Sequence, residues 1–499
     1  MPKSLVIVES PAKAKTISRF LGDDYTVEAS VGHIRDLIQP KDVKSDTKYK
    51  PDEHVDNTTL NKFGIQTNQG AVVNELLQKL GVKTWIPWYV ESTKSQKTIA
   101  QLKRALKKAD ALYLATDEDR EGEAIAWHLV EVLKPDMPVY RMVFHEITEK
   151  AILEALDATR AIDMNQVSAQ ETRRVLDRII GYDLSGLARQ VIGGGATGGR
   201  VQSPTLRKIV ERERERIRFT STQYWSATAQ LDANQVSSFD AKLIGINHQR
   251  VASGKADFDE NGSLKKPDEV VILTEDKATK LKETYTNESL AVTSAETSPY
   301  RRQPKPPFTT STFQQEVINK LGGSSGAAMA IAQGLYQNGY ITYHRTDSPG
   351  LSDQALNAAR KGVEELCGLD FLPENPRRYV TKSDSAQEAH EAIRPAGEAF
   401  RTPEQIKGEL NKDQLAVYEL IYKRTLASQM NDEIGETKRV ILEAEKSDQE
   451  IYHATFSATG RTITHLGFKQ IYEEAPNTSN DQESTNILPD LSEGDLFSA

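Results

Sequence analysis

The chain has 499 residues, of which 38% are hydrophobic and 27% are charged, and its formal net charge is −9. At about 100–200 residues per domain this length predicts several domains, and the composition is that of a globular protein. The acidic balance excludes a uniformly basic coat for nucleic acid. A local basic cleft can still attract a polyanion, because the local potential and not the net charge acts on the ligand.

Three simple patterns exclude other classes of protein. No run of about 18 apolar residues occurs, which excludes a transmembrane helix and predicts no membrane partner. The apolar run at the N-terminus is broken by Glu9 and therefore does not resemble a secretory signal. A single cysteine, Cys367, excludes an intramolecular disulfide framework and a CxxC zinc ribbon, so we expect no zinc and a reducing, cytoplasmic compartment.

The first third of the chain alternates predicted strands and helices. Residues 4–8 form an apolar run typical of a buried strand, and Ser10 and Pro11 then mark the start of a helix. A second strand is predicted over residues 111–116, followed by an acidic loop and an apolar-faced helix. This alternation predicts an α/β domain with a mostly parallel sheet over about residues 1–155.

The remaining two thirds divide into helical and strand-like regions. Helical spacing dominates residues 156–223 and 301–430, the latter interrupted by a strand-like run, whereas period-two alternation marks residues 224–300 and 431–499. We therefore expect a β-rich domain that a helical insertion interrupts. The Pro-rich segment Ser298–Phe308 is predicted to be a hinge, and the polar residues 476–486 are predicted to form a loop.

An acidic cluster follows the second predicted strand and contains Asp117, Glu118, Asp119 and Glu121. If the backbone stays extended, Asp117, Asp119 and Glu121 project to one side, because strand side chains alternate. Crowded carboxylates repel one another, and a hard divalent cation such as Mg²⁺ relieves that repulsion. The same acids also suit the start of the following helix, whose dipole stabilises them, so both interpretations stay open.

Glu9 lies at the end of the first predicted strand, with Lys13 in the first turn of the helix that follows. A helix start that carries a lysine is a plausible corner for an anion, although a lone glutamate there is commonly only a helix-start charge. If the two strands are parallel neighbours, their ends meet at one edge of the sheet. We therefore expect Glu9 to lie near the acidic cluster.

A third candidate segment contains Tyr343, Arg345 and Asp347 within a strand-like run, residues 340–346 and onward. A tyrosine beside a guanidinium can act as a nucleophile on phosphate, with the arginine stabilising charge on the phosphate oxygens. Alternatively, Tyr343 is an aromatic core residue and the two charged side chains form a surface pair. The segment alone does not decide between them.

Taken together, these segments resemble type IA DNA topoisomerases, and the bacterial topoisomerase I group in particular. The matching motifs occur in the order of that family and span residues 4–395. They are LVIVESPAKAKTI, GHIRDL, ATDEDREGEAIAWHL, RRVLDRIIGYDLS, GGRVQSPTLRKIVERERE, PPFTTSTFQQE, GYITYHRTDS and QEAHEAIRP.

The resemblance implies roles for residues at the matching positions. Tyr343 corresponds to the nucleophile, Arg345 to the adjacent catalytic arginine, and Glu9 and Lys13 to the Toprim residues beside the scissile phosphate. The acids implied to bind Mg²⁺ are Glu9, Asp117, Asp119 and Glu121. The residues implied to bind DNA are His33, Arg173, Arg174, Asp177, Arg200, Gln202, Asp347 and His390.

The implied fold is a multidomain α/β, α and β protein with a toroidal gate. It would comprise an N-terminal Toprim α/β domain over residues 1–155, an incomplete helical DNA-groove domain over 156–223, a β-rich hinge or arch over 224–300 and 431–499, and a helical domain carrying Tyr343 over 301–430. The implied activity is ATP-independent cleavage and religation of single-stranded DNA through a 5′-phosphotyrosine, which relaxes negatively supercoiled DNA. We expect a monomeric, nucleoid-associated cytoplasmic isomerase.

The sequence departs from the family at its C-terminal end. A further helical segment of the family would begin at about residue 499. This departure puts strand passage in doubt and leaves two rivals: a fragment that only binds single-stranded DNA, and another Toprim protein, a primase or nuclease, in which Tyr343 has no role. The arginines of residues 173–200 have a second interpretation too, as surface pairs with Asp177, Glu211 and Glu213.

Overall fold

The computed structural model describes residues 3–45, 62–68, 84–233, 237–380, 391–445, 451, 453–473 and 488–498. His390 and the predicted loop over residues 476–486 lie outside these residues. The chain forms two compact units. Unit 1 comprises Met1–Arg207, Pro307–Ala358 and Arg378–Tyr422, and unit 2 comprises Lys208–Pro306, Ala359–Arg377 and Lys423–Ala499.

The N-terminal part of unit 1 is built on a parallel sheet with the strand order β2-β1-β7-β8. The strands are β1 Ser4–Val8, β2 Tyr25–Ala29, β7 Ala111–Leu114 and β8 Val139–Arg141. The central strand β1 is fully apolar and buried from Leu5 to Val8, as expected for a sheet covered on both faces. The predicted α/β domain with a parallel sheet is confirmed.

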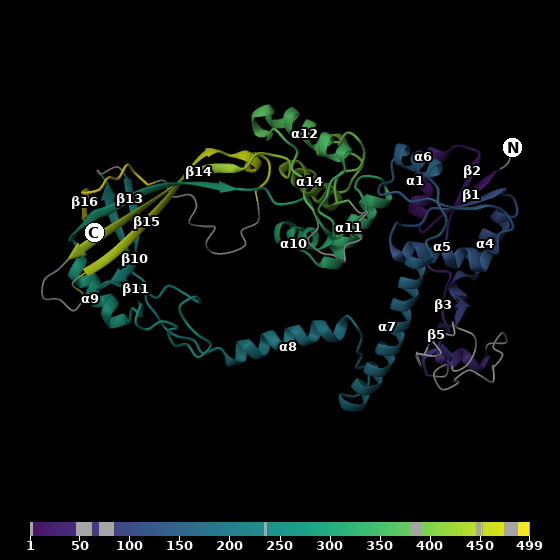
Figure 1. Cartoon of the computed structure of the whole chain (residues 1–499), viewed down its shortest axis with the longest axis horizontal. Coiled ribbons are helices and arrows are strands. Elements are labelled where there is room, and N and C mark those ends of the chain that lie inside the picture. Colours follow the sequence, from purple (N-terminus) through teal and green to yellow (C-terminus); the bar gives the residue numbers. More distant parts are fainter. Residues whose placement is uncertain are drawn as a thin grey trace, which may run out of the picture. The chain divides into compact units, whose positions relative to one another are not determined.

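Helices α1 (Pro11–Leu21), α4 (Gln96–Leu106) and α5 (Arg120–Leu133) pack around this sheet (Figure 1). Helix α1 begins where predicted, because the Ser10 side chain accepts a hydrogen bond from the Lys13 backbone N–H. It ends at Gly22, whose φ of +69° favours glycine. The apolar face of α5, including Ile125 and Leu129, enters the same core as strand β7.

Small strand pairs and further helices complete unit 1. The strand pairs are β3 Arg35–Leu37 with β6 Tyr89–Glu91, and β4 Ile65–Asn68 with β5 Thr84–Pro87. The helices are α6 Glu149–Asp157, α7 Met164–Val191, α10 Thr310–Leu321, α11 Ser325–Gln337 and α13 Pro403–Ile406. Short 3₁₀ turns cover Pro40–Ser45 and Thr93–Ser95.

Three helices begin in one unit and end in the other: α8 Gln202–Arg218, α12 Asp353–Cys367 and α14 Lys412–Ala427. The described helices are therefore concentrated in residues 149–218 and 310–427, as the helical spacing predicts. None of the helices among the described residues combines the length and apolar character needed to cross a membrane.

Unit 2 is organised around a largely antiparallel sheet with the order β12-β11-β10-β15-β14-β13-β16, and β9 pairs with β10. Its strands are β9 Thr228–Ala233, β10 Ser237–Ile246, β11 Gln249–Val251, β12 Val270–Val271, β13 Ser289–Arg302, β14 Glu433–Glu445, β15 His453–His465 and β16 Leu496–Ser498. Strands from both sides of the helical insertion thus share one sheet and one core, which confirms the predicted interruption and resumption.

Three local predictions differ from the structure. Residues 298–302 of the predicted hinge belong to β13 and pair with β14; Pro299 is accommodated there because β16 pairs only with the start of β13. The predicted strand over 340–346 is irregular, with a single bridge between Ile341 and Pro395. Helix α9 (Glu275–Tyr285) was not predicted: its apolar residues Ala278, Leu281 and Tyr285 have helical spacing, but they lie between strand-like runs.

Candidate active site

The ends of β1 and β7 meet at one edge of the parallel sheet, as predicted. Ile7 pairs with Leu114, so the residues that follow each strand are brought together. The Asp117 backbone N–H donates a hydrogen bond to Glu9 Oε1 at 3.0 Å. The proximity of Glu9 to the acidic cluster, expected from parallel neighbours, is therefore confirmed.

Lys13 lies between the two carboxylates at these strand ends. Its ammonium group donates to Asp117 Oδ1 and lies 3.6 Å from Glu9 Oε2, and only 1% of its side chain is exposed. The first turn of α1 positions Lys13, because Ser10 and Pro11 fix where the helix starts. The hydroxyl of Tyr336, in α11, also donates to Asp117 Oδ1, at 3.0 Å. Asp117 therefore has two buried donors.

These contacts separate the acidities of Glu9 and Asp117. Burial, reinforced by the neighbouring negative charge of Asp117, raises the pKa of Glu9 to about 8. Burial would also raise the pKa of Asp117, but the charge of Lys13 and the surrounding hydrogen bonds lower it below its ordinary value. At neutral pH the proton therefore resides on Glu9 and the negative charge on Asp117.

Tyr343 is buried against the acidic cluster with its hydroxyl engaged. The hydroxyl donates to Asp119 Oδ2 at 2.7 Å, the backbone N–H donates to the His145 carbonyl at 2.9 Å, and the side chain is 3% exposed. Burial and the charges of Asp117 and Asp119 raise the pKa of Tyr343 above its ordinary value. In this arrangement Tyr343 is a neutral phenol that donates to a carboxylate.

Arg345 and His33 both lie against Glu121, at the more open side of the cluster. Arg345 Nη1 is 3.3 Å from Glu121 Oε2, and His33 Nε2 is 3.6 Å from Glu121 Oε1. The hydrogen bond from His33 lowers the pKa of Glu121 more than partial burial raises it. Asp347 is exposed two residues beyond Arg345.

The three acids after β7 do not share one side of an extended strand, which corrects that prediction. The strand ends at Leu114, Asp119 is the N-cap of α5 and accepts from the Gly122 N–H at 2.8 Å, and Glu121 lies inside the helix. The helix-start interpretation therefore describes part of the cluster, because the N-cap needs an acceptor there.

The acids suit a divalent cation by donor chemistry, because Mg²⁺ prefers carboxylate oxygens. In the described arrangement each carboxylate has another partner: Lys13 and Tyr336 contact Asp117, Tyr343 contacts Asp119, and Arg345 contacts Glu121. Among the described residues, no group of three or more His, Cys, Asp or Glu side chains converges as a metal site would. Metal ligation by these acids therefore stays a prediction.

The predicted DNA-binding arginines lie on and beside α7. Arg200 Nε donates to Asp177 Oδ1 at 2.6 Å, Arg173 lies 3.9 Å from the same carboxylate, and Arg174 Nε donates to Asp36 Oδ1 at 2.9 Å. Gln202 is the first residue of α8. The pairing with Asp177 agrees with the surface-pair alternative, whereas Glu211 and Glu213 pair instead with Lys208 and Arg216. Their binding of DNA stays a prediction.

Sequence reasoning missed Arg141 and Tyr336. Arg141 is fully buried, and its guanidinium donates to the Asp117 carbonyl at 2.6 Å, to the Thr116 carbonyl at 2.9 Å and to Glu123 Oε2 at 2.9 Å. It therefore fixes the backbone that carries the acids. The sequence contained one signal for Arg141, a charged residue inside an apolar strand pattern. It contained no such signal for Tyr336, because tyrosine is common in apolar helices.

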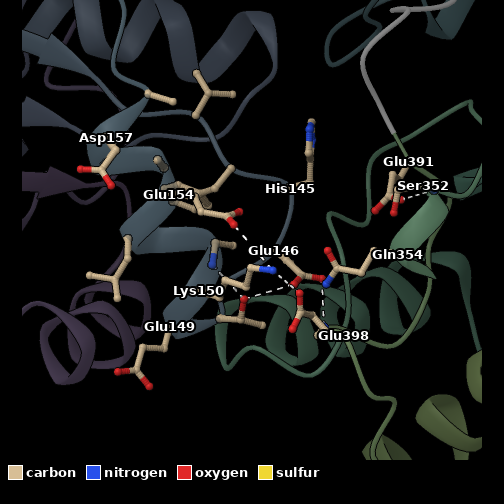
Figure 2. A pocket seen from close by; sticks show the side chains of 18 of the residues that line it. His145, Glu146, Glu149, Lys150, Glu154, Asp157, Ser352, Gln354, Glu391 and Glu398 are labelled. Carbon is tan, nitrogen blue, oxygen red and sulfur yellow. Dashed lines mark hydrogen bonds and ion pairs between the residues drawn. The ribbon is translucent and has the colours of Figure 1, made fainter. Parts of the chain in front are cut away.

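A cavity of about 1010 Å³ lies beside the point where the Tyr343 backbone contacts residue 145. Figure 2 shows Glu146, which precedes α6, and Lys150, in the first turn of α6, facing Gln354 and Glu398. Glu146 Oε2 accepts from Arg394 Nη1 at 2.8 Å and from the Gly397 N–H at 3.0 Å. These buried contacts join the N-terminal α/β part of unit 1 to the helical part that carries Tyr343.

Two models of known protein families match this chain. A family model described as DNA topoisomerase matches residues 161–499, and the Toprim-domain model matches residues 4–147. The chain belongs to the type IA DNA topoisomerase family. The fold class expected from the sequence is thereby confirmed, and the Toprim domain is a metal-binding fold.

Relatives in the topoisomerase family cover the whole chain. It is 46% identical to DNA topoisomerase 1 of Mycolicibacterium smegmatis over 509 residues, which is 100% of this chain and 52% of that protein. It is also 46% identical to DNA topoisomerase 1 of Streptomyces coelicolor, over 100% of this chain and 50% of that protein. The chain thus spans about half the length of these curated relatives.

A solved topoisomerase structure shares the fold. Full-length topoisomerase I from Thermotoga maritima matches with a TM-score of 0.72 and 33% identity, over 99% of this chain and 70% of that chain. The likeness therefore extends over both compact units and is not confined to the Toprim domain.

Proposed function

We propose that this chain cleaves and rejoins single-stranded DNA through a covalent bond to Tyr343. The observation that carries the proposal is the contact between the Tyr343 hydroxyl and Asp119, at 2.7 Å, within a cluster that also holds Glu9 and Lys13. A carboxylate partner alone does not distinguish Tyr343, because Tyr340 contacts Glu409; what distinguishes it is that its partner belongs to the acidic cluster. Its hydroxyl here points at the residues where Toprim chemistry is expected.

In the proposed cleavage step, the Tyr343 oxygen attacks a backbone phosphorus and the bond from phosphorus to the 3′ oxygen breaks. The products are a 5′-phosphotyrosine and a free 3′-hydroxyl, and no ATP is required because the phosphodiester is exchanged and not hydrolysed. Asp119 is positioned to accept the phenolic proton, and Glu9, protonated at neutral pH by its raised pKa, can donate a proton to the leaving 3′ oxygen. Arg345 and Lys13 would stabilise charge on the phosphate oxygens.

We further propose Mg²⁺ as the cation of the Toprim domain, held by Asp117 and Asp119 with Glu121 and Glu9 nearby. The carboxylate chemistry supports this assignment. A bound cation would supply positive charge that holds the DNA ends for rejoining. Asp119 can contribute only when it no longer accepts from Tyr343, which happens once the tyrosine is bonded to phosphate.

The substrate we propose is single-stranded DNA within negatively supercoiled DNA, with His33, Arg173, Arg174, Asp177, Arg200, Gln202, Asp347 and His390 among its contacts. Relaxation would require the part that bears Tyr343 to separate from the Toprim domain while a second strand passes. We propose a monomer that acts on the nucleoid in the cytoplasm. A fragment that cleaves or binds without strand passage is the second candidate, because the chain spans about half the length of its relatives.

Trapping of a covalent adduct tests the proposal. A labelled single-stranded oligonucleotide incubated with the 499-residue chain should give a denaturation-resistant adduct, and Tyr343→Phe should abolish it while binding is retained. Tyr340→Phe is the matched control, because its hydroxyl contacts Glu409 and not the acidic cluster; it should leave the adduct unchanged. An adduct that persists in Tyr343→Phe would rule out this tyrosine as the nucleophile.

A further inference from the structure

Val31 lies in an unusual turn beside the proposed active site. It follows β2 and has a φ of +58°, and the next residue, Gly32, has a φ of +81°. Its side chain is 64% exposed. An exposed, β-branched residue in the left-handed region is uncommon, because its branched side chain crowds the backbone there.

The other non-glycine residues with positive φ are of different types. Among the residues that the structure describes they are Lys134, Asn247, His248 and Asn287, and none of these is β-branched. Asparagine and glycine are the residues favoured at such positions. Strained backbone of this kind persists where neighbouring structure enforces it, and it concentrates at functional sites.

The backbone on both sides of Val31 is hydrogen-bonded to Val8, the last residue of β1, and to Glu9, which follows it. The Ser30 N–H donates to the Val8 carbonyl at 2.8 Å, and the Gly32 N–H donates to the Glu9 carbonyl at 3.1 Å. These two hydrogen bonds hold the turn on both sides of Val31. Val31 therefore lies beside the backbone of Val8 and Glu9, and its side chain is exposed.

The same turn also reaches the other side of the acidic cluster. His33, two residues after Val31, lies 3.6 Å from Glu121, which in turn contacts Arg345. The turn therefore contacts both sides of the site. One side holds Glu9, proposed to protonate the 3′ oxygen, and the other holds Glu121, the partner of Arg345. The turn bordered by these residues thus carries an exposed apolar side chain, Val31.

We propose that Val31 is a substrate-positioning residue whose isopropyl group packs against the sugar and base of the nucleotide next to the phosphate that Tyr343 attacks. The inference rests on the proposed function and adds a contact to it. The ligand is single-stranded DNA, because the nucleotide must present a free sugar–base face. Strain and exposure at Val31 are then retained because the side chain is buried only when DNA is bound.

Two substitutions separate this role from a structural one. Val31→Gly and Val31→Asn both tolerate the left-handed backbone but remove the isopropyl group. We expect their melting temperatures to equal or exceed that of the parent chain. Cleavage of a labelled oligonucleotide at limiting concentration should fall about tenfold, the loss expected for an apolar contact of this size. Val31→Ile, which retains the apolar contact, should cleave like the parent.

The matched control is Lys134→Gly, which makes the same backbone change at an exposed left-handed residue at the end of α5. It should leave cleavage unchanged. Parent-like cleavage by both Val31 variants, or lower melting temperatures in both, would overturn the proposal. If the parent itself forms no adduct, the proposed function fails separately. Oligonucleotide affinity then decides the role of Val31: about tenfold weaker binding of the variants supports the contact, and equal binding overturns it.

Discussion

Unit 1 contains two groups of polar and charged residues that differ in burial: those at the ends of β1 and β7, and the arginines of α7. Lys13, Tyr336 and Tyr343 are each at most 3% exposed, and each contacts a particular carboxylate oxygen. By contrast, Arg173 is 61% exposed and shares Asp177 with Arg200.

The contrast indicates different functions for the two regions. A buried charge without its partner is strongly unfavourable, so each side chain in the buried cluster is specified by its neighbours and controls protonation. Exposed arginines contribute little to stability in pairs, yet together they can attract a polyanion. Substitutions in the buried cluster should therefore give large effects on chemistry or folding, and substitutions on α7 should give small, salt-dependent effects on binding.

The largest effect should come from neutralising the acids of the buried cluster. Asp117→Asn with Asp119→Asn should slow religation on the order of 100-fold, because neutral amides hold a cation poorly, and should also slow cleavage, because an amide at position 119 cannot accept the Tyr343 proton. Rates of adduct formation and of rejoining, measured with and without Mg²⁺, check this. The control is Asp110→Asn with Asp136→Asn, two exposed acids near the same sheet. Identical Mg²⁺ dependence of religation in the double variant and the parent would contradict the assignment.

Glu123 allows a direct comparison of buried and exposed partners, because one carboxylate contacts an arginine of each kind. Arg141 is fully buried, whereas the side chain of Arg160 is 41% exposed. Arg141→Met should lower the free energy of unfolding by about 3 kcal/mol. Arg160→Met should lower it by about 1 kcal/mol or less. Chemical denaturation of both variants measures the difference, and equal losses would show that burial is not what distinguishes these arginines.

Local sequence rules predicted the scaffold of the site. The Ser10–Pro11 helix start and the meeting of two parallel strand ends follow from capping preferences and sheet geometry. These features depend on residues close in sequence or on a general property of parallel sheets. The proximity of Glu9 to Asp117 therefore follows from the order of strands and helices along the chain.

The partners inside the site could not be predicted in the same way. Tyr336 contacts a residue 219 positions away, and nothing in its own helix marks that contact. The strand prediction around Tyr343 failed because the backbone bonds of this run go to separate segments. The Thr342 N–H donates to the Arg394 carbonyl and the Tyr343 N–H donates to the His145 carbonyl, so no continuous ladder forms. The positive φ at Val31 was also hidden, because valine normally indicates a regular strand.

The exposed arginines should determine how steeply the affinity for single-stranded DNA falls as the salt concentration rises. Replacing Arg173 and Arg174 together with alanine should flatten the plot of log affinity against log salt by about one unit or more, at roughly 0.7 per phosphate contacted on a single strand. The melting temperature should change little, because each pair is partly exposed. Oligonucleotide binding over a salt series gives the slope.

The control for charge removal is the pair Lys266→Ala and Lys361→Ala, exposed lysines that pair with Glu269 and Glu365. This variant loses the same formal charge and should keep the parent slope. An unchanged slope in the arginine variant, together with a lowered melting temperature, would show that Arg173 and Arg174 are structural and that DNA binds elsewhere.

The smallest expected effect concerns acid stability, where buried and exposed carboxylates again differ. Burial alone would raise the pKa of Glu391, but the charge of Arg394 and the Ser352 N–H lower it. A carboxyl whose folded pKa lies below its unfolded value of about 4.3 stabilises the fold above that pH, and the contribution is lost as the pH falls through the folded pKa. Glu391→Gln should therefore lower stability at pH 7 by on the order of 1 kcal/mol and converge with the parent near pH 3.

The exposed pair of Glu409 with Arg401 also lowers a carboxyl pKa, through their hydrogen bond. Solvent screens that pair, so the unfolding curves of Glu409→Gln should follow the parent at every pH. Equal pH dependence of the two variants would mean that the contact between Arg394 and Glu391 is no more protected from solvent than the surface pair.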